Sequence, residues 1–324
     1  MASKRGQVPA RPESVAATDA SRQRPGLNEV YAVWLLFALA AVAVFVTYWR
    51  LPPNELWRVT QSGPAGGAGR AFVFLSYSAA LATIAVVAIV VGRLANRRAV
   101  PLGIASCVLC ATVAIPGVQT PDDLDAKWAN LPAVLGVGLA VGLTAWAAVR
   151  GRPERKRTTR AGDLARLGAG LVALVWATPY IAAELGFFLD GVPLLGWFFQ
   201  TSRLRPEEPG SSSIQAAVHH GHHHGLDGFL LAVTALLLSR LLGGIRRRWL
   251  RSLTAAFLSL MLVYGLANMA NDLWDEQVVK RSWTTWLLPD VLFPSLSPAW
   301  AAIVGCAVVV YLAFWRERPL LGRR

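Results

Sequence analysis

All five histidines of the chain lie within six positions, from His219 to His224, in the segment AVHHGHHHGLDG. A helix that begins near Ile214 and continues through this segment turns by about 100° per residue, which gathers most of the cluster on one face. Imidazole pairs four residues apart, followed by a carboxylate one turn later, suit Zn, Cu, Ni or Fe. We therefore predict a divalent transition metal as the cofactor. Its predicted ligands are His219, His220, His223, His224 and Asp227.

Glycines follow the opposite side of the same predicted helix, at Gly221, Gly225 and Gly228. Each glycine inside a helix costs up to about 1 kcal/mol, so three of them favour a surface on which a neighbouring helix approaches closely. Three alternatives stay open for the histidines. They form a flexible loop, a site that responds to pH because imidazoles titrate near neutrality, or a polar stretch without a specific role.

Two carboxylates elsewhere have the chemistry of an acid or a base. Glu184 lies within the apolar sequence ATPYIAAELGFFL, and an ionisable group at membrane depth is expensive enough to indicate function. Asp272 lies in GLANMANDLWDEQ, where one helical face also carries Asn268, Asn271, Asp275 and Glu276. We predict Glu184 and Asp272 as catalytic groups that exchange protons with a substrate.

The elements that position these groups are transmembrane helices. The chain is 54% hydrophobic and 16% charged, which is too apolar for a soluble globule of 324 residues. Apolar runs of about 20 residues recur along it without the alternation of a barrel strand. We predict an all-α polytopic bundle of about eight spans, near residues 31–49, 71–92, 99–118, 131–149, 167–189, 226–242, 253–269 and 299–315.

The basic residues predict the orientation of this bundle, because Lys and Arg near helix ends remain on the cytoplasmic side. With eight spans, 24 of the 32 Lys and Arg residues fall on the side of the two termini. Both termini are therefore expected in the cytoplasm, and the histidines outside. The high net charge of +13 is explained by this distribution, so nucleic acid is not predicted as a partner.

The predicted domain organisation is simple. Residues 1–28 form a disordered cytoplasmic tail, 29–318 a single membrane domain, and 319–324 a second tail. The longer outer connections lie near 184–225 and 271–298. Arginine outnumbers lysine 28 to 4, which suggests a GC-rich bacterial genome and a multi-pass protein of the bacterial plasma (inner) membrane.

The sequence leaves the function open among three classes. The first is a membrane enzyme that depends on a metal at its extracytoplasmic face. The second is a non-catalytic assembly or pH-sensing component, and the third is a transporter of metal ions or protons. The first four runs and the eighth hold no charged residue in their interiors, which disfavours a polar path across the whole bilayer. The lipid bilayer is the one partner that the sequence indicates, and no protein partner is predicted.

Overall fold

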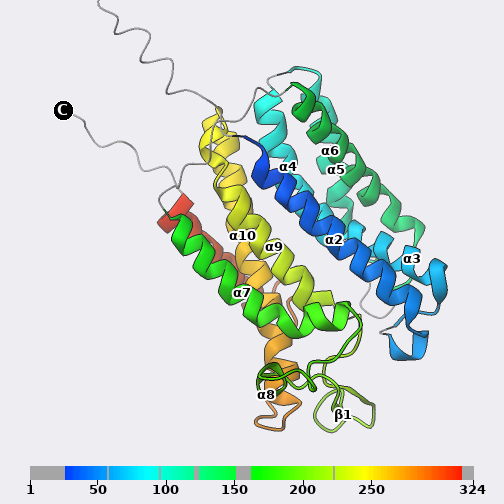
Figure 1. Ribbon diagram of the computed structural model, residues 1–324. Helices are drawn as coiled ribbons and strands as arrows, with labels where there is room; N and C mark the ends of the chain where they lie inside the picture. Colours follow the sequence, from blue (N-terminus) through cyan, green and yellow to red (C-terminus); the bar gives the residue numbers. More distant parts are fainter. Residues whose placement is uncertain are drawn as a thin grey trace, which may run out of the picture.

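The computed structural model describes residues 26–56, 58–94, 96–119, 124–150, 162–221 and 223–315, except for the side chain of His223. These residues form a predominantly helical bundle, in which long helices run side by side (Figure 1). Both predicted tails lie largely outside the described residues. The all-α fold class is confirmed.

Each of the eight predicted apolar runs falls on a helix. The helices are α2 (Asn28–Arg50), α4 (Ser78–Leu94), α5 (Ala99–Ala111), α6 (Leu131–Arg150), α7 (Asp163–Glu184), α9 (His223–Ser239), α10 (Arg248–Trp274) and α11 (Pro298–Val310). Two π-helical turns, Asp275–Val279 and Tyr311–Trp315, extend α10 and α11. Five of the described helical segments are long and apolar enough to cross a membrane.

The remaining helices explain why fewer than eight helices of the described structure are long enough to span a membrane. Helix α3 (Gly63–Ser76) joins α4 at a bend of 43°, and counting this pair as one broken span gives six. The other two, Ala99–Ala114 and His224–Ser239, are apolar but shorter. In the predicted spans that match them, Pro101 and Pro116 interrupt the first, and Asp227 and Arg240 the second.

Helix α9 lies in the interior of the bundle, against both α7 and α10. A methyl group added at Gly225 would strike the ring of Tyr180 on α7. One added at Gly228 would lie 2.5 Å from the carbonyl oxygen of Gly265 on α10. The close helix approach predicted from these glycines is confirmed, because only hydrogen fits between the helices at these points.

A small non-helical layer covers one end of the bundle. Strands β1 (Leu204–Pro206) and β2 (Ile214–Ala216) pair antiparallel, and the short helix α8 (Leu195–Phe198) precedes them. In Figure 1 this layer lies at the end where α7 finishes and α9 begins. The carboxylate of Asp190 organises the connection, because it accepts hydrogen bonds from the backbone of Thr201 and Ser202, at 3.0 and 2.6 Å.

The prediction of one continuous helix from Ile214 through the histidines is wrong. Ile214 belongs to β2, and α9 begins only at His223. Gly221 has a φ of +78°, a left-handed conformation that ends any helical path before α9. His219 and His220 therefore belong to a connection, and the predicted common face of four imidazoles does not form.

Candidate functional site

Four buried carboxyl groups lie at the end of the bundle that the non-helical layer covers. Glu184 ends α7, Asp227 lies in the first turns of α9, Asp272 lies near the end of α10, and Glu276 follows in its π-helical extension. Each residue is at most 6% exposed. We call Glu184, Asp227, Asp272 and Glu276 the acid cluster. Buried carboxyls at membrane depth are expensive, so such a group indicates a functional site.

Arg70 supplies positive charge to this cluster from α3. The side chain is only 5% exposed, and its charge acts on Glu184 and on Asp227. The guanidinium also lies over the ring of Tyr48, 5.8 Å from the centroid. The Tyr48 hydroxyl in turn donates to the Gly221 carbonyl at 3.3 Å. Arg70 thus connects α2 and the histidine connection to the acid cluster.

The local sequence explains how an arginine reaches the interior. Helix α3 begins GPAGGAGR, and a methyl group at Gly67 would strike the Phe45 carbonyl oxygen of α2. The absence of side chains at Gly66 and Gly67 lets α3 pack directly on the α2 backbone. Arg70, one turn later, is thereby placed inside the bundle instead of at its rim.

The bend between α3 and α4 lies beside the same cluster. Tyr77 forms the joint, and its hydroxyl contacts that of Tyr264 on α10. The Tyr264 hydroxyl also donates to the Leu292 carbonyl at 2.7 Å. Ser78, the first residue of α4, is fully buried and interacts with Asp227. Broken helices place backbone and side-chain polar groups at binding sites in membrane proteins.

Two basic side chains contact the acid cluster on the α10 side. Nδ1 of His224 lies 3.8 Å from Oδ1 of Asp272. Nζ of Lys280 lies 3.7 Å from Oε1 of Glu276, and it donates to the Ala217 carbonyl at 2.9 Å. The π-helical turn between Asp275 and Val279 places Glu276 and Lys280 toward the cluster, and such turns are frequent at functional sites.

The other histidines have different surroundings. His220 is buried and stacks on Phe188, with ring centroids 4.2 Å apart. Burial lowers the pKa of His220, against a smaller opposing effect of Glu55. This imidazole is therefore held neutral and packed as an aromatic ring.

The predicted site residues are divided between these surroundings. Asp227 interacts electrostatically with Arg70 and Glu184, His224 contacts Asp272, and His220 packs on Phe188. Among the residues that the structure describes, no group of three or more His, Cys, Asp or Glu side chains is arranged to hold a metal ion. His222 and the side chain of His223 lie outside that part of the chain. The metal site itself stays a prediction.

One member of the acid cluster, Glu276, and the two basic residues beside the cluster, Arg70 and Lys280, were not singled out from the sequence as site residues. Glu276 was noted only as part of a polar face. Arg70 precedes an apolar run, so the sequence places it in an outer connection. Lys280 is likewise predicted to lie in a loop. The one sequence signal for Arg70 is the run of glycines before it, since close helix packing is what turns that position inward. The chain matches no family model, no curated protein and no solved structure.

Proposed function

We propose that this chain is an integral membrane enzyme of the bacterial plasma membrane, and that the acid cluster is its acid–base site. In this proposal all eight apolar helical units cross the bilayer, with the broken pair α3 and α4 as one of them. The termini lie in the cytoplasm and the acid cluster in the outer half. Glu184 and Asp272 exchange protons with the substrate, and Arg70 orients an anionic group of it.

The observation that carries this proposal is the burial of four carboxyl groups at one end of the bundle, with the permanently basic Arg70 and Lys280 in their surroundings. Burying several carboxylates near one another is costly, because each loses its hydration and like charges repel. Such a cluster favours retained protons on some of its carboxyls, or a bound cation. A buried carboxyl that retains its proton near neutral pH is what a general acid requires.

The location of the site favours an enzyme over a transporter. Helix α9 separates Asp227 in its first turns from Arg240, directly after its last residue Ser239, by about 20 Å at 1.5 Å per residue. Leu230, Leu231 and Leu238 between these ends are buried and apolar. The opposite end is held by ion pairs of Arg240 with Asp163 and Glu29. A polar path from the acid cluster across the whole bundle is not supported by this arrangement.

Infrared difference spectroscopy tests the proton-holding role. Protein in lipid nanodiscs is taken from neutral to alkaline pH, and the carbonyl stretch of protonated carboxyl groups is followed. We expect a band that disappears on alkalinisation and that is reduced in Glu184→Gln and in Asp272→Asn. Glu208→Gln, an exposed control, leaves the band intact. A wild-type protein without any such band contradicts the acid–base role.

Cysteine labelling in a cysteine-free background tests the orientation. Cys107, Cys110 and Cys306 are replaced first. A cysteine at Ser212 is then expected to react with an impermeant maleimide added outside intact cells, whereas one at Arg246 reacts only after lysis. The reverse pattern overturns the orientation.

A transition-metal ion is the second candidate for the charge that balances the cluster. The contact that favours it is the His224–Asp272 pair, because an imidazole and a carboxylate are suitable ligands for Zn, Cu, Ni or Fe. Elemental analysis of untagged protein, purified without metal-affinity resin, then finds about one metal ion per chain. The variant His224→Ala loses it, and His220→Ala, a matched control, retains it. Metal-free wild-type protein after addition of these ions contradicts this candidate.

A further inference from the structure

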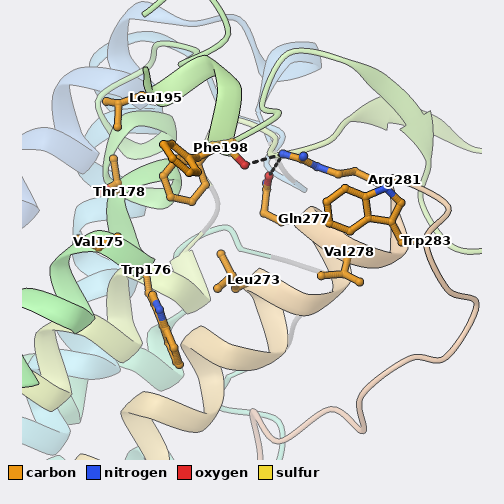
Figure 2. A pocket seen from close by; sticks show the side chains of 11 residues that line it. Val175, Trp176, Thr178, Leu195, Phe198, Leu273, Gln277, Val278, Arg281 and Trp283 are labelled. Atoms are coloured by element: carbon orange, nitrogen blue, oxygen red, sulfur yellow. Dashed lines mark hydrogen bonds between the residues drawn. The ribbon is translucent and has the colours of Figure 1, made fainter. Parts of the chain in front are cut away.

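A second feature lies on the outside of the bundle, separate from the acid cluster. A groove of about 530 Å³ lies between α7, α8 and the end of α10 (Figure 2). Its floor and walls are apolar and aromatic and include Val175, Trp176, Phe198, Leu273 and Trp283. Figure 2 shows Arg281 near Trp283 and Gln277 at one end of this groove.

The groove faces the surroundings of the bundle. Val175 is 58% exposed, and other large apolar side chains of α7, such as Leu167 and Leu171, are exposed as well. In a helix that spans a membrane, such a surface faces acyl chains. Exposed tryptophans at 197, 283 and 286 surround the end where Arg281 lies. Tryptophan concentrates at the level of lipid headgroups, which places Arg281 at that level.

Arg281 is held in position by fixed contacts. Its Nη2 donates to the Phe198 carbonyl at 2.6 Å and to Oε1 of Gln277 at 3.3 Å, and the guanidinium lies 5.0 Å from the Trp283 ring centroid. The side chain as a whole is partly exposed and lines the groove. A guanidinium held in position there suits a phosphate group, which accepts hydrogen bonds on several oxygens.

The charge around Arg281 is positive. Burial lowers the pKa of this guanidinium, and the charges of Arg203 and Arg205 lower it further. Asp190 acts in the opposite sense, and its hydrogen bonds with Thr201 and Ser202 favour its charged form, but one carboxylate stands against three arginines. Three arginines within electrostatic reach repel one another, and an anion between them removes that repulsion.

We propose that this groove binds an anionic phospholipid, with acyl chains against Val175, Trp176 and Leu273 and the phosphate at Arg281. The combination of an apolar channel at acyl depth and positive charge at headgroup depth matches both halves of such a molecule. Arg203 and Arg205 supply the charge that prefers an anionic lipid to a zwitterionic one. This site is independent of the acid–base role proposed for the acid cluster.

Native mass spectrometry of delipidated protein in detergent tests the site. The probes are phosphatidylglycerol and phosphatidylcholine with identical acyl chains. We expect one phosphatidylglycerol to bind about tenfold more tightly than phosphatidylcholine, because the phosphate is common to both lipids and Arg203 and Arg205 repel the choline cation. In wild-type protein this preference decreases with added salt. Equal affinity for the two lipids, or a preference that salt leaves unchanged, overturns the proposal.

Matched variants separate the two halves of the site. The double variant Arg203→Gln, Arg205→Gln reduces the preference for phosphatidylglycerol, and Arg281→Gln weakens the binding of both lipids. Arg246→Gln, an exposed arginine next to the other end of α10, changes neither. Val175→Trp, at an exposed position, fills the groove and weakens the binding of both lipids. Retention of the full preference in the variant Arg203→Gln, Arg205→Gln, or unchanged binding in Arg281→Gln or in Val175→Trp, contradicts the assignment. Inorganic phosphate that binds as tightly as phosphatidylglycerol shows a phosphate site without a lipid role, and also overturns it.

Discussion

Arg240, which directly follows α9, and Asp163 of α7 form a two-pronged contact at the end of the bundle opposite the acid cluster. Nε and Nη2 of the arginine each donate to one carboxylate oxygen, both at 3.1 Å. Nη1 donates to Glu29 of α2 at 2.6 Å. One side chain therefore joins three helices. Paired Arg–carboxylate geometry is the strong form of the ion pair.

Removal of this arginine is expected to destabilise the protein. Arg240→Met leaves Asp163 and Glu29 partly buried without this partner, a loss of about 3 kcal/mol by comparison with other broken buried pairs. The thermal unfolding temperature in detergent measures it. Arg246→Met, which removes an exposed arginine on the same side, serves as control and changes it little. Equal stability of the two variants contradicts the joining role of Arg240.

Side chains added between α9 and α10 are expected to separate these helices. Gly228→Ala places a methyl group 2.5 Å from the Gly265 carbonyl oxygen and 3.0 Å from Cγ of Met269. We expect a loss of about 1–3 kcal/mol, as for other overpacked interiors. Gly305→Ala in α11 is the matched control, because nothing lies within 4 Å of its added methyl group. That control is neutral or stabilising by up to about 1 kcal/mol, and a drop in unfolding temperature as large as that of Gly228→Ala argues against the packing reason.

The stability conferred by His220 depends on pH. Its pKa in the folded protein lies below the ordinary value, so below about pH 6.5 the unfolded chain binds a proton more readily than the folded one. The contribution of His220 to the free energy of unfolding is therefore complete above about pH 6.5 and is lost as the pH falls below that value. The unfolding temperature of the wild type should therefore decrease more, between about pH 7.5 and 5.5, than that of His220→Gln. Parallel curves for the two proteins would exclude this role.

Arg70 and Glu184 are expected to depend on each other. Arg70→Met leaves the acid cluster without its α3 cation, and we expect a loss of about 3 kcal/mol. At alkaline pH, where Glu184 is ionised, Glu184→Gln removes one carboxylate charge, so the double variant is expected to regain about 1 kcal/mol or more relative to the sum of the single losses. Chemical unfolding of the four proteins measures this coupling. Additive losses show that the two side chains do not interact.

The apolar helices were predictable because their signal is local. A span needs only about 20 consecutive apolar residues, and each predicted run falls on a helix. The close helix contacts at Gly225 and Gly228 were also predictable, since a helix tolerates the cost of a glycine only where a neighbouring helix approaches closely. Glu184 and Asp272 stood out because a carboxyl within apolar sequence is rare and expensive.

The arrangement of the histidines was not predictable in this way. A helical path through HHGHHH depends on Gly221, whose left-handed φ follows from the packing of Tyr48 against it. That contact joins residues 173 positions apart, and no local pattern contains it.

What the sequence alone determined is therefore the helical class of the protein, the positions of its apolar helices and the rare carboxyls within them. The tertiary structure decided which of these groups meet. It placed Arg70 among Glu184 and Asp227 through the glycine-mediated contact of α3 with α2, and it separated His220 from His224. The physical reason is the distance along the chain over which each effect acts. Hydropathy acts along a few turns of one helix, whereas the charge balance of a buried site is a sum over side chains from many helices.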